Sequence, residues 1–163
     1  MHRALALLAL CLGCLPLGCV SFSSGGLFPE GRDRVHLEYF GNATFYRDVQ
    51  FLLTEQVSRE ILSRPGLHMS TKDEAQVILR GRVLKVIQSV LSEDPNQTVT
   101  TSSTTITVQV EVVDALTGEV IKQAKLSQVG QFVPSLGEDL ADAQRQAYRF
   151  LARDIVRELE AEF

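Results

Sequence analysis

The stretch Thr104–Leu126, TTITVQVEVVDALTGEVIKQAKL, decides the fold of this 163-residue chain. In its first half, polar residues alternate with the apolar residues Ile106, Val108, Val110 and Val112, which is the pattern of a strand with one buried face. Asp114 and Gly118 lie in a short polar turn, where glycine supplies a positive φ. The second half is also strand-like, so the stretch predicts a long β-hairpin. Its apolar face needs helices laid across it.

The segment before the hairpin supplies one helix. Between residues 45 and 63 the apolar residues step by four, with Leu52 widening a stripe of Phe45, Val49, Leu53, Val57 and Ile61. Asn42 or Thr44 is the candidate N-cap. Arg64-Pro65-Gly66 then ends the helix.

A second helix is predicted near the C-terminus. Gly137-Glu138-Asp139 opens it, because acidic residues are favourable at the positive end of the helix dipole. Phe150 backs an apolar stripe formed by Leu140, Ala143, Ala147, Leu151, Ile155 and Leu159.

The other apolar patterns are strand-like. We expect a first strand at 35–39, a short edge strand at 67–69 and a long strand at 76–91. The Thr/Ser run at 98–105 would begin the hairpin, and its second arm would continue through Val129 and Phe132 to Pro134. This order predicts an α+β two-layer sandwich: a mixed, mostly antiparallel sheet of about four strands with two helices packed on one face. Residues 34–163 would form this single domain.

Residues 1–18 have the features of a secretory signal peptide. The apolar run Ala4–Leu17 is too short to span a bilayer. It ends in Leu17-Gly18-Cys19, which resembles the lipobox of bacterial lipoproteins. We expect Cys19 to be lipidated, with Cys14 as the alternative. An ordinary cleaved signal with incidental cysteines is the other interpretation.

The residues after Cys19 bear on where the anchored protein would lie. Residues 19–33 are rich in Ser and Gly and would form a flexible tether. Three acyl chains would make the anchor permanent. Val20, rather than Asp, follows the cysteine, which favours the outer membrane, with the domain facing the periplasm.

Composition and motifs argue against several classes of function. The formal net charge is −4, which is a poor basis for binding nucleic acid. The sequence contains no Gly-x-Ser-x-Gly elbow, no glycine-rich phosphate loop and no Cys or His cluster with metal-ligand spacing. His36 and His68 are separate. We therefore expect no enzyme activity, no metal site and no cofactor.

Several phrases together resemble the lipopolysaccharide-assembly lipoprotein (LptE) family. They are the leader end Gly18–Ser23, Arg64-Pro65-Gly66 at the helix end, DEAQVILRG at 73–81, VDALTGEV at 113–120 and LARDIV at 151–156. The order and spacing of these phrases carry the resemblance, which covers nearly the whole chain.

The resemblance implies a non-catalytic protein that sits inside, and helps to fold, the outer-membrane β-barrel that inserts lipopolysaccharide (an LptD-type protein). It also implies direct binding of lipopolysaccharide. Such a plug needs polar strand surface facing the barrel lumen and cations for the phosphates of lipid A.

The candidate cations lie on two strands of the predicted sheet. Arg80 and Arg82 share one face of the long strand and Lys85 follows closely, whereas Lys122 and Lys125 lie on the second arm of the hairpin. These five residues would form a phosphate-binding patch if the strands are neighbours; the alternative is a solvated face with scattered charges. The Thr/Ser run at 98–105 would either contact the barrel wall or form an ordinary loop.

Two other functions fit the same sequence. The chain could be a lipoprotein activator of a periplasmic enzyme such as a cell-wall synthase, or a subunit of another envelope export complex. A likeness of fold does not decide among these partners.

Overall fold

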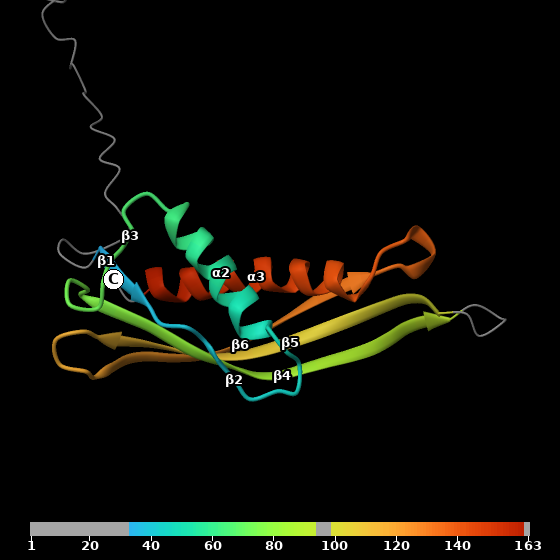
Figure 1. Cartoon of the computed structure of the whole chain (residues 1–163), viewed down its shortest axis with the longest axis horizontal. Helices are drawn as coiled ribbons and strands as arrows, with labels where there is room; N and C mark the ends of the chain where they lie inside the picture. The colour runs from blue at the N-terminus through green and yellow to red at the C-terminus, as the bar shows by residue number, and fades with distance from the viewer. Residues whose placement is uncertain (1–32, 94–98, 162–163) are drawn as a thin grey trace, which may run out of the picture.

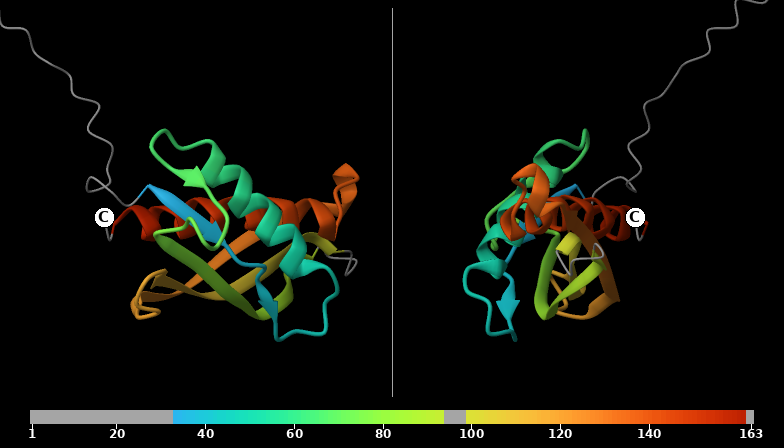
Figure 2. Two further views of the ribbon diagram at one scale, coloured as in Figure 1. Left: turned by 60° about the vertical axis from the view of Figure 1, so that its left-hand side comes forward. Right: turned by 90° about the vertical axis from the view of Figure 1, so that its right-hand side faces the viewer.

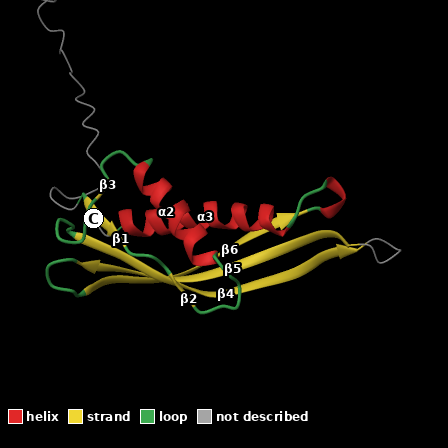
Figure 3. Ribbon diagram, viewed as in Figure 1, coloured by secondary structure: helices red, strands yellow, loops and turns green. Residues whose placement is uncertain are grey.

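The computed structural model describes residues 33–93 and 99–161. Two helices lie over one face of a long, twisted sheet (Figure 1, Figure 3). In chain order the elements are β1 (Arg34–Leu37), β2 (Gly41–Asn42), α2 (Val49–Leu62), β3 (His68–Met69), β4 (Val77–Glu93), β5 (Val99–Asp114), β6 (Val120–Phe132), the 3-10 turn η1 (Pro134–Leu136) and α3 (Leu140–Glu160). The predicted α+β two-layer arrangement is confirmed.

The sheet is mixed and six-stranded, in the order β3-β1-β4-β5-β6, with β2 also paired to β4. β4, β5 and β6 form an antiparallel meander. The parallel pairings are those of β1 with β3, of β1 with β4 and of β2 with β4. The expected count of about four strands was too low. β3 corresponds to the short edge strand expected at 67–69, and β2 is a further short pairing.

The central hairpin is confirmed, with its turn where the sequence places it. The Asp114 carboxylate accepts hydrogen bonds from the backbone N–H groups of Leu116 (2.9 Å) and Thr117 (3.0 Å). Gly118 follows with φ 74°, a conformation that costs glycine little. The side chain of Asp114 therefore helps to hold the turn.

α3 follows its sequence signals closely. Asp139 is the N-cap, and it exchanges side-chain-to-backbone hydrogen bonds with Asp142 in a capping box. The hydrogen bond from the Asp139 backbone N–H is the main reason why the pKa of the Asp142 carboxyl is lowered. Phe150, expected to back the apolar stripe, is instead 36% exposed.

α2 departs from its prediction. It begins at Val49 rather than Phe45, which is fully exposed, and its N-cap is Asp48 in the left-handed region (φ 64°) without a side-chain cap. Asn42 caps no helix: its carboxamide bonds to Thr44 and Tyr46 and so folds the preceding loop. Leu52 is also exposed, and the buried side of the helix is Val49, Leu53, Thr54, Val57 and Ile61.

One apolar core lies between the helices and the sheet. It joins the buried stripes of α2 and α3 to alternate residues of β4 and β5, among them Leu79, Val83, Val108 and Val110. Gly130 of β6 lies directly beneath α3, because a Cβ atom there would be 1.8 Å from the Ala143 carbonyl oxygen. Figure 2 shows α2 crossing α3 on this side of the sheet. None of the helices in the described ranges is long and apolar enough to cross a bilayer.

Candidate functional site

The face of the meander turned away from the helices carries a cluster of cations. Because cross-strand partners point to the same side of a sheet, the pairings define three outward rows across β4, β5 and β6. These rows are Arg80–Glu111–Gln123, Arg82–Gln109–Lys125 and Lys85–Thr107–Ser127. We call this surface the open face, since both described helices lie on the opposite side (Figure 1).

Two β-bulges decide which cations share the open face. In β4 the pairing passes from Val83 directly to Lys85, so Leu84 is an extra residue and Lys85 turns outward. In β6 the pairing passes from Val120 to Lys122, so Ile121 is extra and Lys125 turns outward. Four of the five predicted site residues therefore lie on one surface.

Lys122 is not part of this surface. It pairs with Val112, whose side chain is buried in the core, and its Nζ lies 3.0 Å from Glu158 Oε2 on α3. The bulge at Ile121 thus sends Lys122 toward the helices. The expectation that all five cations gather in one patch is corrected at this residue.

The four outward cations differ in their partners. Arg80 Nε donates to Glu111 Oε2 (2.8 Å), while Gln123 Nε2 donates to the other carboxylate oxygen (3.0 Å). Within the described ranges, no ion pair forms at Arg82, Lys85 or Lys125. Adjacent strands are about 4.8 Å apart, so the Arg82 and Lys125 backbones are separated by about 10 Å across Gln109. These three cations leave a local positive charge on an acidic chain.

A hollow of about 470 Å³ adjoins this cluster at the edge of β4. Arg80, Arg82 and Gln109 line it from the sheet, and Tyr39 lines it from the segment between β1 and β2. The Tyr39 ring meets Phe51 edge to face, with 6.1 Å between centroids. The sequence did not mark Tyr39 or Gln109 as site residues, because an isolated aromatic or amide side chain gives no signal of a site.

The remaining site predictions have separate outcomes. The Thr/Ser run is strand rather than an ordinary loop from Val99 onward, and its residues Ser102, Ser103 and Thr104 are buried, which leaves them little surface for a partner. Thr98, Cys14 and Cys19 lie outside the described residues.

The two histidines in the described ranges have separate environments. His36 Nδ1 donates to the Ser70 carbonyl oxygen (3.1 Å), whereas His68 lies in β3 and is exposed. In the part of the chain that the structure describes, no three His, Cys, Asp or Glu residues are grouped as metal ligands would be. The candidate site is therefore the cationic open face.

The fold and this surface define a class: a two-layer α+β domain with one sheet face closed by helices and exposed cations on the other. The lipopolysaccharide-assembly model of the LptE family matches residues 32–161, and the chain belongs to this family. The family is one of non-catalytic lipoproteins of lipopolysaccharide assembly, so the chain is a lipoprotein of that process and not an enzyme. No curated protein matches the sequence.

Solved structures share the fold at low sequence identity. A hypothetical protein from Chlamydia trachomatis superposes with a TM-score of 0.61 at 13% identity, covering 80% of this chain and 97% of that chain. A protein from Xanthomonas campestris has a TM-score of 0.58 at 12% identity, with 79% and 84% covered. Lipoprotein B from Nitrosomonas europaea has a TM-score of 0.52 at 13% identity, with 79% and 83% covered. These likenesses concern the fold alone.

Proposed function

We propose that this lipoprotein is an outer-membrane component of lipopolysaccharide transport that plugs and helps to assemble an LptD-type β-barrel and binds lipopolysaccharide directly. The observation that carries the binding proposal is a group of three cations on the open face that have no carboxylate partner among the described residues: Arg82, Lys85 and Lys125. Family membership supports the process in which the protein acts.

The chemistry of the open face suits the phosphates of lipid A. Arg82 offers a planar fork of donors that matches phosphate oxygens, and Lys85 and Lys125 supply point charges on either side of Gln109 and Thr107. Arg80 completes the predicted set, although its guanidinium must be shared with Glu111 (2.8 Å). Each charge-assisted contact contributes about 1.5–3 kcal/mol when partly shielded from water.

The proposed anchor places the domain close to the membrane. Residues 1–18 would be removed as a signal peptide, Cys19 would be lipidated (or Cys14 in the alternative), and residues 19–33 would form the tether. A flexible segment of this length spans about 20 Å on average. The domain of residues 34–163 would thus remain at the periplasmic side of the outer membrane and within reach of a barrel.

The first experiment concerns the partner. A C-terminal tag and mild detergent extraction of the membranes should recover a large outer-membrane β-barrel protein at one-to-one stoichiometry. Recovery of a periplasmic enzyme without a barrel would reject the plug and favour a lipoprotein activator.

The second experiment concerns the ligand. We expect the triple variant Arg82→Ser, Lys85→Ser, Lys125→Ser to bind lipopolysaccharide at least tenfold more weakly than the unmodified lipoprotein in detergent. The control replaces three cations that lie outside the open face and have carboxylate partners, Arg64→Ser, Lys72→Ser, Arg157→Ser, with the same change in charge. An equal loss in both triple variants would show non-specific attraction and reject the site. The open-face triple variant and the unmodified protein should bind dephosphorylated lipopolysaccharide with the same affinity.

A further inference from the structure

The outward side of α3 carries an arginine at every fourth position. Residues 142–157 read DAQR QAYR FLAR DIVR, which places Arg145, Arg149, Arg153 and Arg157 on successive turns. All four side chains are exposed. Successive arginines are separated by about 6 Å of helix rise, so their like charges repel one another.

The two outer arginines are neutralised and the two inner ones are not. Arg145 pairs with Asp142 and Arg157 with Asp154, each three residues earlier. The residues three positions before Arg149 and Arg153 are Gln146 and Phe150, which carry no negative charge. Arg153 lies over the Phe150 ring, 6.0 Å from its centroid. Among the described residues, neither Arg149 nor Arg153 forms an ion pair.

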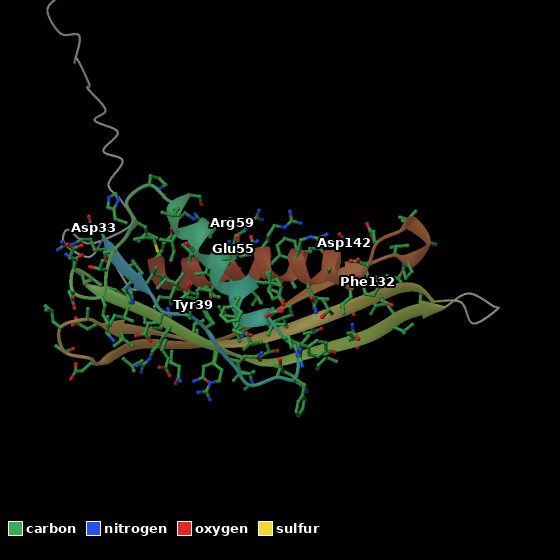
Figure 4. The ribbon with its side chains drawn as sticks, viewed as in Figure 1. Asp33, Tyr39, Glu55, Arg59, Phe132 and Asp142 are labelled. Atoms are coloured by element: carbon green, nitrogen blue, oxygen red, sulfur yellow. The ribbon has the colours of Figure 1, made fainter. Side chains whose placement is uncertain are left out.

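α2 contributes a third guanidinium at the point where the helices adjoin. Two neighbouring hollows, of about 420 and 170 Å³, share the lining residues Gln56, Arg59 and Arg149. The smaller one is also lined by Arg153 and Ser63. Figure 4 shows Arg59 and Glu55 on α2 and Asp142 on α3, on the helical side of the molecule. We call this continuous depression the α2–α3 trough.

The acids around the trough already have partners. Glu55 pairs with Arg59, and Glu60 pairs with Arg64 at 2.8 Å. Asp154 accepts from Arg157 with one carboxylate oxygen and from Gln128 with the other. Glu138 accepts the Val133 backbone N–H at 2.8 Å. None of these contacts involves Arg149 or Arg153, so a surplus of positive charge remains at the centre of the helix.

We propose that the α2–α3 trough is a second anion site, which binds a phosphate monoester or diphosphate group between Arg149 and Arg153. Two guanidinium forks on adjacent turns match the several oxygens of such a group, and the Gln56 carboxamide and Ser63 hydroxyl on α2 are further donors. A bound anion would also relieve the repulsion between the two arginines. The site lies on the opposite side of the sheet from the open face, so the two sites are independent.

The test uses the detergent-solubilised lipoprotein and inorganic pyrophosphate, with affinity measured by titration calorimetry. With the open-face triple variant as the common background, so that the other proposed anion site does not contribute, adding Arg149→Gln, Arg153→Gln should weaken pyrophosphate binding at least tenfold. The matched control adds Lys72→Gln, Arg157→Gln, which removes the same charge but only from exposed cations that have a carboxylate partner and lie outside the trough. This control should retain the affinity of the background protein within about threefold.

Two further measurements make the outcome decisive. Circular dichroism after either added pair of substitutions should show unchanged helix content, because all four side chains are exposed. Vesicles with and without phosphatidic acid, whose headgroup is a phosphate monoester, then separate a lipid headgroup from a soluble phosphate as the source of the anion. Equal weakening by the two added pairs of substitutions, or no binding of pyrophosphate or of anionic vesicles by the background protein, would overturn the proposal.

Discussion

The two faces of the meander are built from the same three strands, yet they are organised by different forces. On the covered face, β-branched residues such as Ile106 and Val108 are fully buried beneath the helices. On the open face, the intervening residues Thr107, Gln109 and Glu111 meet side chains of β4 and β6 and partly contact solvent. Packing holds the covered face together, whereas the cations of the open face are exposed to solvent.

The difference predicts how each face responds to substitution. Changes on the covered face should cost free energy of unfolding, because the core is close-packed. Changes on the open face should cost little stability and should alter binding instead. Four measurements test this division.

The largest effect is expected at Gly130. A Gly130→Val substitution would place side-chain atoms where the Ala143 backbone lies, since even a Cβ atom would be 1.8 Å from its carbonyl oxygen. α3 would have to leave the sheet, so we expect a loss of about 4 kcal/mol or more, or no folded protein. Urea denaturation measures the loss. Lys125→Val on the outward side of the same strand is the control, and its effect should stay within about 0.5 kcal/mol.

Adjacent residues of β5 give the next contrast. Ile106→Ala removes a fully buried side chain and should cost about 3 kcal/mol. Thr107→Ala removes one hydroxyl contact to Ser127 (3.1 Å) on the open face and should cost about 0.5–1 kcal/mol. Equal losses at the two positions in urea denaturation would contradict the assignment of the two faces.

Tyr148 of α3 makes the covered layer sensitive to alkaline pH. Burial raises the pKa of its hydroxyl to about 12 from the ordinary value of 10.0. Because the folded state holds this proton more tightly than the unfolded state, its contribution is constant below pH 10 and is lost as pH rises from 10 to about 12. Two pKa units correspond to a loss of about 2.7 kcal/mol.

The measurement compares the unfolding free energy of the unmodified protein with that of Tyr148→Phe across this pH window. The variant should lose less stability between pH 10 and 12, and the difference isolates Tyr148 from the lysines that titrate nearby. Below pH 10 the variant should be as stable as the unmodified protein or more so, since the buried hydroxyl has no hydrogen-bond partner among the described residues. Parallel pH profiles would show that the hydroxyl has the same pKa in the folded and unfolded states, and would contradict the pKa raised by burial.

Much of the covered face could be predicted from the sequence. The period of two at Ile106, Val108 and Val110 and the period of about four at Leu151, Ile155 and Leu159 mark residues that are buried in the structure. These periods follow directly from strand and helix geometry. The start of α2 could not be predicted in this way, because Phe45 continues the four-residue step but lies in a loop shaped by Asn42.

The composition of the open face could be predicted only in part. Which way Lys85, Lys122 and Lys125 point depends on the bulges at Leu84 and Ile121, and each bulge reverses the side on which the following residues lie. Neither bulged position carries a Gly or Pro that would mark it. The arginines of the α2–α3 trough were also missed. Their four-residue spacing is visible in the sequence, but their lack of carboxylate partners appears only when α2 is placed beside α3.

The smallest effect concerns two ion pairs, one on each side of the sheet. Lys122–Glu158 (3.0 Å) joins β6 to α3, and its side chains are 23% and 34% exposed. Arg80–Glu111 (2.8 Å) lies on the open face, with 47% and 23% exposed. Double-mutant cycles with alanine should give a coupling free energy of about 1 kcal/mol for the first pair and about 0.3 kcal/mol for the second.

The reason for the difference is screening. The pair beneath the helix has less contact with water and is tied to two elements that are already ordered, so it gives up little side-chain entropy. Raising the salt concentration should therefore weaken the Arg80–Glu111 coupling more than the Lys122–Glu158 coupling. If the two couplings were equal at every salt concentration, Lys122 would be as accessible as Arg80. The helical layer would then offer no more shielding than the open face, and the division between the two faces would fail for charged residues.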